Sequence, residues 1–187
     1  MSKIDKKQEI LKAALELFAE QGFHGAPMSK IAEKAGVAAG TVYCYFESRD
    51  ILIHELFLEV KERINRFLYD RRIIEGTVRE RFQTVISGLL RYFVTHPEDF
   101  RYLEQFHNSP YGVEYRRIRF FGSTGEEDRM KSLFTDGMKQ KVIKDIPMVI
   151  LFSLTLGPLF DVARDHILGF IQLDDDLVQL TVNACWD

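Results

Sequence analysis

The strongest structural signal in this chain is the stretch MSKIAEKAGVAAGTVYCYFESRD, residues 28–50. Apolar residues at helical spacing flank a central glycine in it: Ile31, Ala32 and Ala35 before, Val42 and Phe46 after. That glycine, Gly36, permits the left-handed backbone conformation that ends one helix and turns the chain sharply. Val37 follows it and is placed to hold the turn against a core. The stretch therefore predicts two short helices joined by a tight turn.

The sequence on either side supplies partners for this pair. Upstream, apolar residues recur at helical spacing over about residues 5–21, and Gly22 closes that segment. Downstream, a long fourth helix begins near residue 51 and extends to about Arg72, with Ser48 placed as its N-cap. The first three helices and the start of the fourth are enough for a small core.

The remainder of the chain carries clear helix start and stop signals. Thr77 and Glu80 form a capping box, which starts a helix that runs to about Thr95. Pro97 suits the first position of a short helix that ends at Ser109-Pro110-Tyr111-Gly112. Thr124 and Glu127 form a second capping box for a helix that reaches about Val142. Two more helices are expected over residues 147–169 and 174–186. The sequence thus predicts an all-α protein of about nine helices.

Composition excludes several classes of protein. The chain has 187 residues, 46% of them hydrophobic and 28% charged, which is a globular composition. The longest uncharged run contains Gly157-Pro158 and is shorter than a membrane span requires, so we expect no membrane insertion and a cytoplasmic protein. Cys44 and Cys185 match neither a metal site nor a disulfide framework.

Side chains with metal or catalytic chemistry show no supporting pattern. None of the five histidines stands at a metal-ligand spacing, and no nucleophile has a base nearby in the sequence. The run Asp174-Asp175-Asp176 is better explained as charge that complements the dipole of the helix it begins. We therefore expect no enzymatic activity, no metal and no cofactor.

The helix after Gly36 has the features of a reader of double-stranded DNA. A helix fits the major groove, where base edges are read, while phosphate contacts hold the protein in register. The small residues Ala38, Ala39 and Gly40 let the backbone approach the groove floor closely, but they cannot make the bidentate hydrogen bonds that discriminate bases strongly. The remaining candidate contacts are hydroxyls and cations: Lys30, Thr41, Tyr43, Tyr45 and Arg49.

The net charge of the chain alone does not indicate that it binds DNA. Residues 1–50 hold seven Lys and Arg against seven Asp and Glu, and the whole chain has a formal charge of −3. Binding must therefore rely on locally placed cations and helix ends. With few strong base contacts, we expect the shape of the DNA to contribute to specificity.

Residues 10–53 resemble the N-terminal DNA-binding domain of the TetR family of bacterial transcriptional regulators. The resemblance rests on three segments with fixed spacing: Ile10 to Phe23 with its Leu17-Phe18-Ala19-Glu20, Ile31-Ala32-x-x-Ala35-Gly36-Val37, and Gly40-Thr41-Val42-Tyr43-x-Tyr45-Phe46-x-Ser48-Arg49-Asp50. It implies a helix-turn-helix domain over residues 1–50, a connector helix over about 49–72, and a C-terminal ligand-binding and dimerisation domain over 73–187. One departure concerns the start of the second helix, where the family often has Thr or Ser and this chain has Pro27-Met28. The corresponding phosphate contact is then missing or shifted to Ser29, and Met28 is free to close the core.

The resemblance also implies a small-molecule effector of largely apolar character. Aromatic residues beyond position 56 supply candidate walls, and polar residues gather around the break near Ser109. An alternative explanation of Asn108 and Ser109 is that they only cap that break. The candidate ligand-binding residues are Phe82, Phe93, Phe100, Glu104, His107, Asn108, Tyr111, Tyr115 and Phe152.

The last two expected helices carry more apolar residues than one face needs, and we interpret the surplus as a homodimer interface. The leading hypothesis is a ligand-responsive repressor that binds a palindromic operator. One alternative is a DNA-binding protein of the same fold with a filled C-terminal core and no effector. The other is a helical small-molecule carrier or enzyme, which would have no need for Thr41, Tyr43, Tyr45 and Arg49 on one surface.

Overall fold

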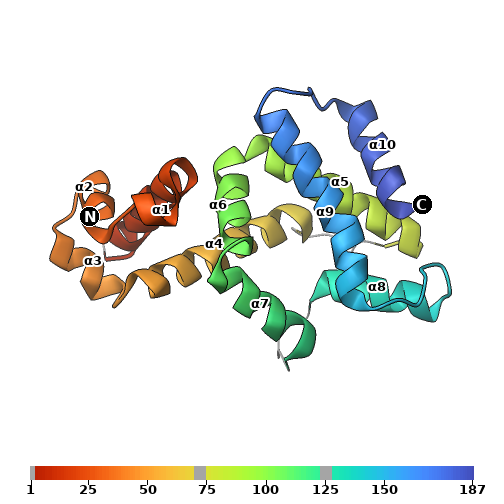
Figure 1. The fold of residues 1–187 in the computed structure, drawn as a ribbon, viewed down its shortest axis with the longest axis horizontal. Helices are drawn as coiled ribbons and strands as arrows, with labels where there is room; N and C mark the ends of the chain where they lie inside the picture. The colour runs from red at the N-terminus through yellow and green to blue at the C-terminus, as the bar shows by residue number, and fades with distance from the viewer. Residues whose placement is uncertain (1–2, 70–74, 123–127) are drawn as a thin grey trace. The chain divides into compact units, whose positions relative to one another are not determined.

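The computed structural model describes residues 3–69, 75–122 and 128–187. These parts of the chain are helical with no strand (Figure 1), which confirms the all-α class. The helices are α1 (Lys3–Gly25), α2 (Met28–Lys34), α3 (Ala39–Tyr45), α4 (Arg49–Tyr69), α5 (Val78–Thr95), α6 (Pro97–His107), α7 (Pro110–Phe121), α8 (Arg129–Lys139), α9 (Met148–Ile167) and α10 (Asp175–Trp186). None of the described helices is long and apolar enough to cross a membrane.

The chain packs as two compact units. Unit 1 comprises Met1–Arg63 and His96–Val113, and unit 2 comprises Ile64–Thr95 and Glu114–Asp187. Helix α6, which lies beyond residue 73, therefore packs with the N-terminal helices. The predicted DNA-binding domain over residues 1–50 and the predicted C-terminal domain over residues 73–187 are defined by function, whereas the two units are defined by packing. The functional division stays a prediction.

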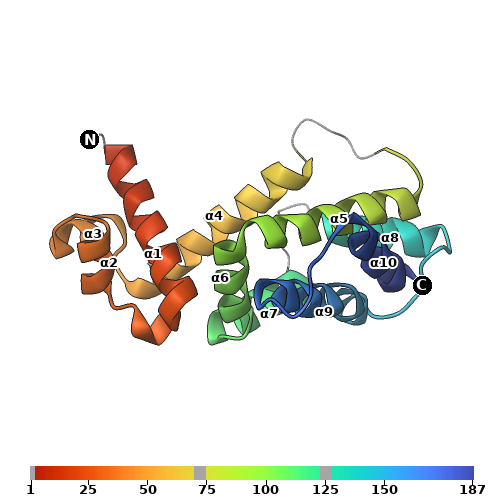
Figure 2. The ribbon, with the colours of Figure 1, turned by 90° about the horizontal axis from the view of Figure 1, so that it is seen from above.

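Unit 1 is built around α1, against which α2 and α6 pack, while α3 packs on α2 (Figure 2). Its core contains the apolar residues that the sequence pattern assigned inward, including Ile10, Phe18, Ile31, Val42 and Phe46. Helix α1 is broken at Gly22, whose φ of 74° lies in the left-handed region. The helix thus stops being regular at the glycine that the sequence indicated as its end.

Unit 2 has α5 at its centre, in contact with α8, α9 and α10. The capping box at the start of α5 is present: the Thr77 amide donates to Glu80 Oε2 over 2.8 Å, and the Glu80 amide donates to Thr77 Oγ1 over 3.3 Å. The hydrogen bonds that the Thr77 amide and hydroxyl donate to the Glu80 carboxylate lower its pKa, because they favour its charged form. The acidic run at Asp174 begins α10, as the sequence predicted, and Asp174 also caps this helix by accepting from the Leu177 amide over 2.9 Å.

Helix α7 was missed by the sequence pattern and raises the number of described helices from the expected nine to ten. Pro110 was interpreted as part of a break, but it stands at the start of a new helix, where its lack of an amide hydrogen costs nothing. Gly112 does not break the chain either. Its Cβ would lie 2.3 Å from the Phe106 carbonyl oxygen, so glycine is required here for a close approach between α6 and α7.

Helix α8 also differs from the expectation. The predicted capping box of Thr124 and Glu127 lies outside the described residues. Asp128 is the N-cap that the structure shows, since its carboxylate accepts from the Lys131 amide over 3.1 Å. The helix ends at Lys139 rather than near Val142, because the chain turns at Lys141, whose φ is 59°.

Candidate nucleic-acid interface

The turn between α2 and α3 is closed by backbone hydrogen bonds typical of a helix C-terminus that ends in glycine. The Gly36 amide donates to the Glu33 carbonyl over 3.1 Å, and the Val37 amide donates to the Ala32 carbonyl over 3.0 Å. Gly36 has a φ of 65°, so the turn needs the left-handed conformation that the sequence predicted. Val37 is only partly buried. The turn holds α3 at a defined angle to α2.

Helix α3 buries one side and exposes the other. Val42 and Phe46 have no exposed surface, whereas Tyr43 is 53% exposed. The small residues Ala38, Ala39 and Gly40 are exposed, while Thr41 and Tyr45 are partly buried. A Cβ added to Gly40 would meet nothing within 4 Å, so packing inside the protein does not require glycine there. The outer surface of α3 is therefore small at its N-terminal end and aromatic further along.

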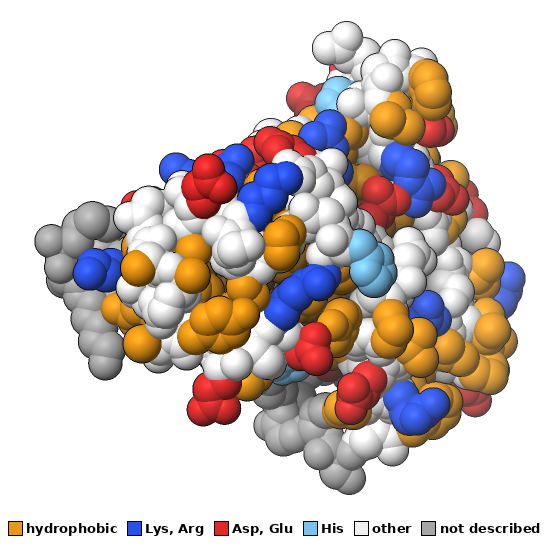
Figure 3. Space-filling model, turned by 60° about the vertical axis from the view of Figure 1, so that its left-hand side comes forward, with side chains coloured by type: hydrophobic (Ala, Val, Ile, Leu, Met, Phe, Trp, Pro, Cys, Tyr) orange, Lys and Arg blue, Asp and Glu red, His pale blue; other side chains and the backbone are white. Residues whose placement is uncertain are grey.

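Polar and charged side chains are exposed on α2, the helix that packs against α3. Ser29 and Lys30 are exposed on α2, and the Lys30 ammonium donates to Oε1 of Gln21 on α1. Met28 is buried, so it closes the core of unit 1, as one interpretation of the family departure expected. Ser48 caps α4 by accepting from the Ile51 amide over 3.2 Å. The face of the molecule drawn in Figure 3 mixes Lys and Arg with acidic and hydrophobic side chains, so charge of one sign does not cover it.

Arg49 is less free than the sequence suggested. Its side chain is partly buried, and Nη2 donates to the Phe23 carbonyl oxygen just beyond the kink of α1. Gln105 of α6 completes the capping of this kink, since its Nε2 donates to the Phe18 carbonyl oxygen over 2.6 Å. Arg49 thus joins the start of α4 to the end of α1.

Helix α6 supports unit 1 by packing against α1 and contacting α4. The hydroxyl of the fully buried Tyr102 donates to the Ile53 carbonyl oxygen of α4 over 2.5 Å, and burial raises the pKa of Tyr102. The rings of Phe57 and Phe106 stack with centroids 4.0 Å apart. Sequence reasoning did not assign these bracing roles, because each pairs residues about 50 positions apart.

Tyr111 makes a contact that sequence reasoning also missed. Its hydroxyl donates to Asp50 Oδ1 over 2.5 Å, and this hydrogen bond raises the pKa of Tyr111. Its ring lies 6.0 Å from that of Phe23 and 6.4 Å from that of Phe106. Tyr111 was a candidate ligand-binding residue, but in the structure it contacts the helices of unit 1.

The other candidate ligand-binding residues are divided between the two units. Unit 1 holds Phe100, Glu104, His107 and Asn108 together with Tyr111, and unit 2 holds Phe82, Phe93, Tyr115 and Phe152. Asn108 is the C-cap of α6, and Ser109 Oγ donates to the Phe106 carbonyl oxygen over 2.7 Å, which agrees with the alternative that these two residues cap a helix end. The role of all these candidates in ligand binding stays a prediction.

The aromatic candidates of unit 2 take part in a packed cluster. The Phe134 ring lies 6.3 Å from that of Phe82 and 5.3 Å from that of Phe152. The Arg119 guanidinium lies over the Phe152 ring at 4.2 Å from its centroid. Phe82 and Phe152 are both buried among such contacts.

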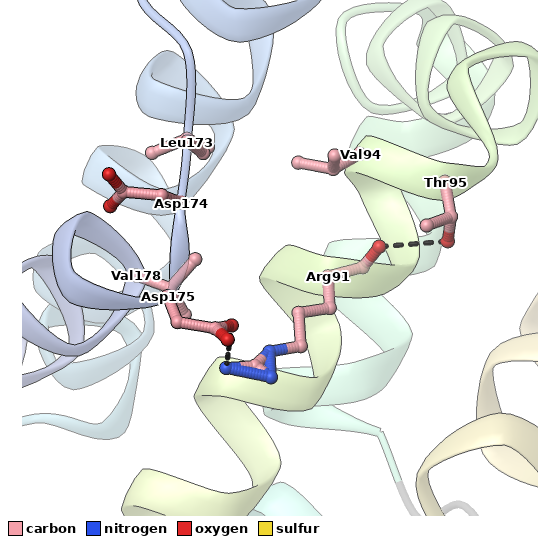
Figure 4. Close-up of a pocket in the computed structure, with 7 residues that line it drawn as sticks. All are labelled: Arg91, Val94, Thr95, Leu173, Asp174, Asp175 and Val178. Carbon is pink, nitrogen blue, oxygen red and sulfur yellow. Dashed lines mark hydrogen bonds and ion pairs between the residues drawn. The ribbon is translucent and has the colours of Figure 1, made fainter.

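A solvent-open hollow of about 370 Å³ lies in unit 2 between α5 and the segment that starts α10 (Figure 4). An ion pair of 2.7 Å between Arg91 and Asp175 crosses it. Its other lining residues are Val94, Thr95, Leu173, Asp174 and Val178. None of the nine candidate ligand-binding residues lines this hollow.

The last two helices of unit 2 expose apolar side chains. Leu154 on α9 is 61% exposed and Leu180 on α10 is 65% exposed. Ile150 on α9 and Leu177 on α10 are exposed as well. Such side chains are normally covered when they form a continuous surface.

Two family models match the chain and together cover most of it. One is described as bacterial regulatory proteins, tetR family, and matches residues 10–56. The other is described as tetracyclin repressor-like, C-terminal domain, and matches residues 77–187.

Curated relatives are also regulators by name. The fatty acid metabolism regulator protein of Bacillus subtilis is 40% identical over 85 residues, which are 44% of this chain and 42% of that protein. The regulator LuxR of Vibrio harveyi is 30% identical over 90 residues, 48% of this chain and 44% of that protein. The chain therefore matches less than half the length of these two relatives.

Solved structures extend the likeness to the whole chain. A TetR family protein from Vibrio parahaemolyticus is 30% identical, with a TM-score of 0.76 and 97% of both chains covered. A TetR family regulator from Marinobacter aquaeolei VT8 has a TM-score of 0.84 at 24% identity, over 100% of this chain and 97% of that one, and shares the fold.

Proposed function

The chain belongs to the TetR family of bacterial regulatory proteins, and on this basis we propose that it is a ligand-responsive transcriptional repressor that binds a palindromic operator as a homodimer. Its role is regulatory rather than enzymatic, and it acts in the cytoplasm, where the DNA is. The observation that carries the proposal is the exposed outer surface of α3, held by the Gly36 turn and flanked by Lys30.

DNA binding divides between base reading and phosphate contacts. The exposed Ala38, Ala39 and Gly40 allow α3 to approach the floor of the major groove, and an alanine methyl suits a thymine methyl. Phosphate contacts come from the cations and hydroxyls around this tip: Ser29, Lys30, Thr41, Tyr43, Tyr45 and Arg49. Because the tip carries few groups for direct readout, DNA shape contributes to specificity.

Dimerisation places two α3 helices on one operator. The exposed leucines of α9 and α10 support an interface between two copies of unit 2. Two recognition helices in successive major grooves require half-sites about 34–36 Å apart.

Regulation requires a ligand that prefers one conformation of the protein. A largely apolar effector that favours the form unable to span two successive grooves releases the operator, since a ligand shifts an equilibrium only through its differential affinity for the two states. The function of residues 73–187 in effector binding and dimerisation is part of this proposal.

The experiment is a binding titration. A palindromic site is selected from random double-stranded DNA with the full-length protein, and its affinity is compared with that of a scrambled site at several salt concentrations. We expect specific binding to exceed nonspecific binding by at least about 10³-fold at physiological salt. Equal affinity for the two DNAs would refute the proposal.

A second candidate function is DNA binding without an effector. The burial of Phe82 and Phe152 and their contacts with Phe134 and Arg119 favour it, because these two side chains pack against other protein groups. A screen of apolar small molecules for release of the selected operator separates the two candidates. A compound that releases the operator supports a ligand-responsive repressor.

A further inference from the structure

Asp50 is an unexpected neighbour for a DNA-contacting cation. It follows Arg49 directly in the first turn of α4, where a negative charge suits the helix dipole. Arg49 belongs to the surface that we propose faces DNA, and its neighbour Asp50 is exposed. A free carboxylate in this position would attract the Arg49 guanidinium and repel phosphates.

The structure gives the two charged groups separate partners. The Arg49 guanidinium donates to the Phe23 carbonyl oxygen, whereas the Asp50 carboxylate accepts the Tyr111 hydroxyl over 2.5 Å. Phe23 also contacts Tyr111, since their rings lie 6.0 Å apart in an edge-to-face arrangement. One small cluster therefore holds both charges.

Tyr111 is itself fixed in place by the corner between α6 and α7. Gly112 lies so close to the Phe106 carbonyl oxygen that no side chain fits, and Ser109 Oγ also donates to that oxygen. The ring of Phe106 lies parallel to that of Tyr111 with an interplanar angle of 19°. The hydroxyl of Tyr111 thus has little freedom to leave Asp50.

From these contacts we infer that Tyr111 is a positioning residue for DNA binding: its hydroxyl holds the Asp50 carboxylate away from Arg49 and keeps that cation available to a phosphate. The inference rests on the proposed function, because it needs Arg49 to contact DNA. It assigns the α6–α7 corner a role in the control of DNA affinity. Movement of this corner would release Asp50 and weaken the operator contact.

The first variant is Tyr111→Phe, which keeps the ring contacts and removes only the hydroxyl. We expect it to lower operator affinity about fivefold, the combined effect of one weakened charge contact in each of two subunits. The salt dependence should also fall, with the slope of log K against log salt reduced by up to about 1.8. Tyr69→Phe is the matched control: it removes a tyrosine hydroxyl in unit 2 and should leave affinity and slope unchanged.

Rescue separates positioning from a merely structural effect. Asp50→Asn keeps an oxygen that accepts a hydrogen bond but removes the charge that competes for Arg49. The double variant Tyr111→Phe with Asp50→Asn should therefore recover the affinity of Asp50→Asn alone. If the double variant binds no better than Tyr111→Phe, the inference is wrong, whatever the thermal stability of the variants.

Arg49→Met tests the premise independently. In this background the Tyr111→Phe substitution should have no further effect on affinity. If Arg49→Met leaves affinity and salt slope unchanged while the wild type binds its operator specifically, the inference fails and the proposed function stands. If the wild type shows no specific binding, the proposed function itself fails.

Discussion

Arg63 of α4 and Asp99 of α6 form a two-pronged ion pair, with 2.5 Å from Nη2 to Oδ1 and 3.1 Å from Nε to Oδ2. The Asp99 side chain is only 5% exposed. We predict that Arg63→Met lowers the free energy of unfolding by about 2 kcal/mol, because it leaves a buried carboxylate without its main cation. Denaturant unfolding measures this.

Adding Asp99→Leu to Arg63→Met also removes the buried negative charge. The double variant should then be more stable than Arg63→Met alone, since a buried carboxylate that has lost its main cation costs desolvation that a leucine does not. Equal stability of the single and double variants would show that the Asp99 carboxylate does not destabilise Arg63→Met.

Gly40 offers a test of close approach to DNA. Its Cβ would meet no protein atom within 4 Å, and alanine favours helices over glycine by about 1 kcal/mol. Gly40→Ala should therefore melt no lower than the wild type, yet bind the operator at least about tenfold more weakly, because the methyl meets the groove floor. Calorimetry and fluorescence anisotropy give the two values. Unchanged affinity would indicate that α3 does not approach closely.

Lys30 is exposed on α2, and its ammonium is held by Gln21 rather than by an acid. Lys30→Gln should weaken binding to specific and scrambled DNA alike. It should also lower the salt slope by about 0.9 for each phosphate that the lysine no longer neutralises. The same series on Lys12→Gln is the control, since Lys12 is exposed on α1 outside the proposed surface. A slope equal to that of the wild type would remove Lys30 from the phosphate contacts.

Leu154 and Leu180 test the dimer. Replacing both with Glu should yield a monomer by light scattering and lower operator affinity, because carboxylates are costly to bury in an interface. Val142→Glu is the control, since Val142 is 53% exposed outside these two helices. A dimer in the double variant would place the interface elsewhere.

The lowered pKa of Glu80 predicts that the stability of the protein depends on pH. The Glu80 pKa is lowered in the folded state, so its stabilising contribution is present at neutral pH and above the unfolded pKa, and is lost as pH falls through the lower folded value. Glu80→Ala should melt below the wild type at pH 7, and the two proteins should converge in acid. Melting curves from pH 7 to pH 3 test this. A gap that does not narrow as pH falls would mean that the capping carboxylate is not its cause.

Local signals predicted much of the fold correctly. The turn at Gly36, the capping box of Thr77 and Glu80 and the helix start at Asp174 each depend on residues within a few positions of one another. Backbone conformation and capping are short-range effects, so the sequence alone indicates them. The same locality misled at Pro110, since a Ser-Pro-Tyr-Gly run suits both a break and a helix start.

The outer surface of α3 was also predicted, because helical periodicity separates Val42 and Phe46 from Tyr43. The partners of the charged residues were not. Arg49 donates to a carbonyl 26 positions away, and Tyr111 reaches an aspartate 61 positions away. Nothing in the sequence near Tyr111 distinguishes a ligand-binding residue from one that contacts the DNA-binding helices.

The amino-acid sequence alone therefore specifies most of the helices, the turn that presents α3 and the family, because these follow from periodicity, glycine conformation and spacing over short distances. The tertiary structure specifies which helices share a core and where each charge finds its partner. It places α6 and Tyr111 with the N-terminal helices, since packing depends on side chains that meet in space across long stretches of chain.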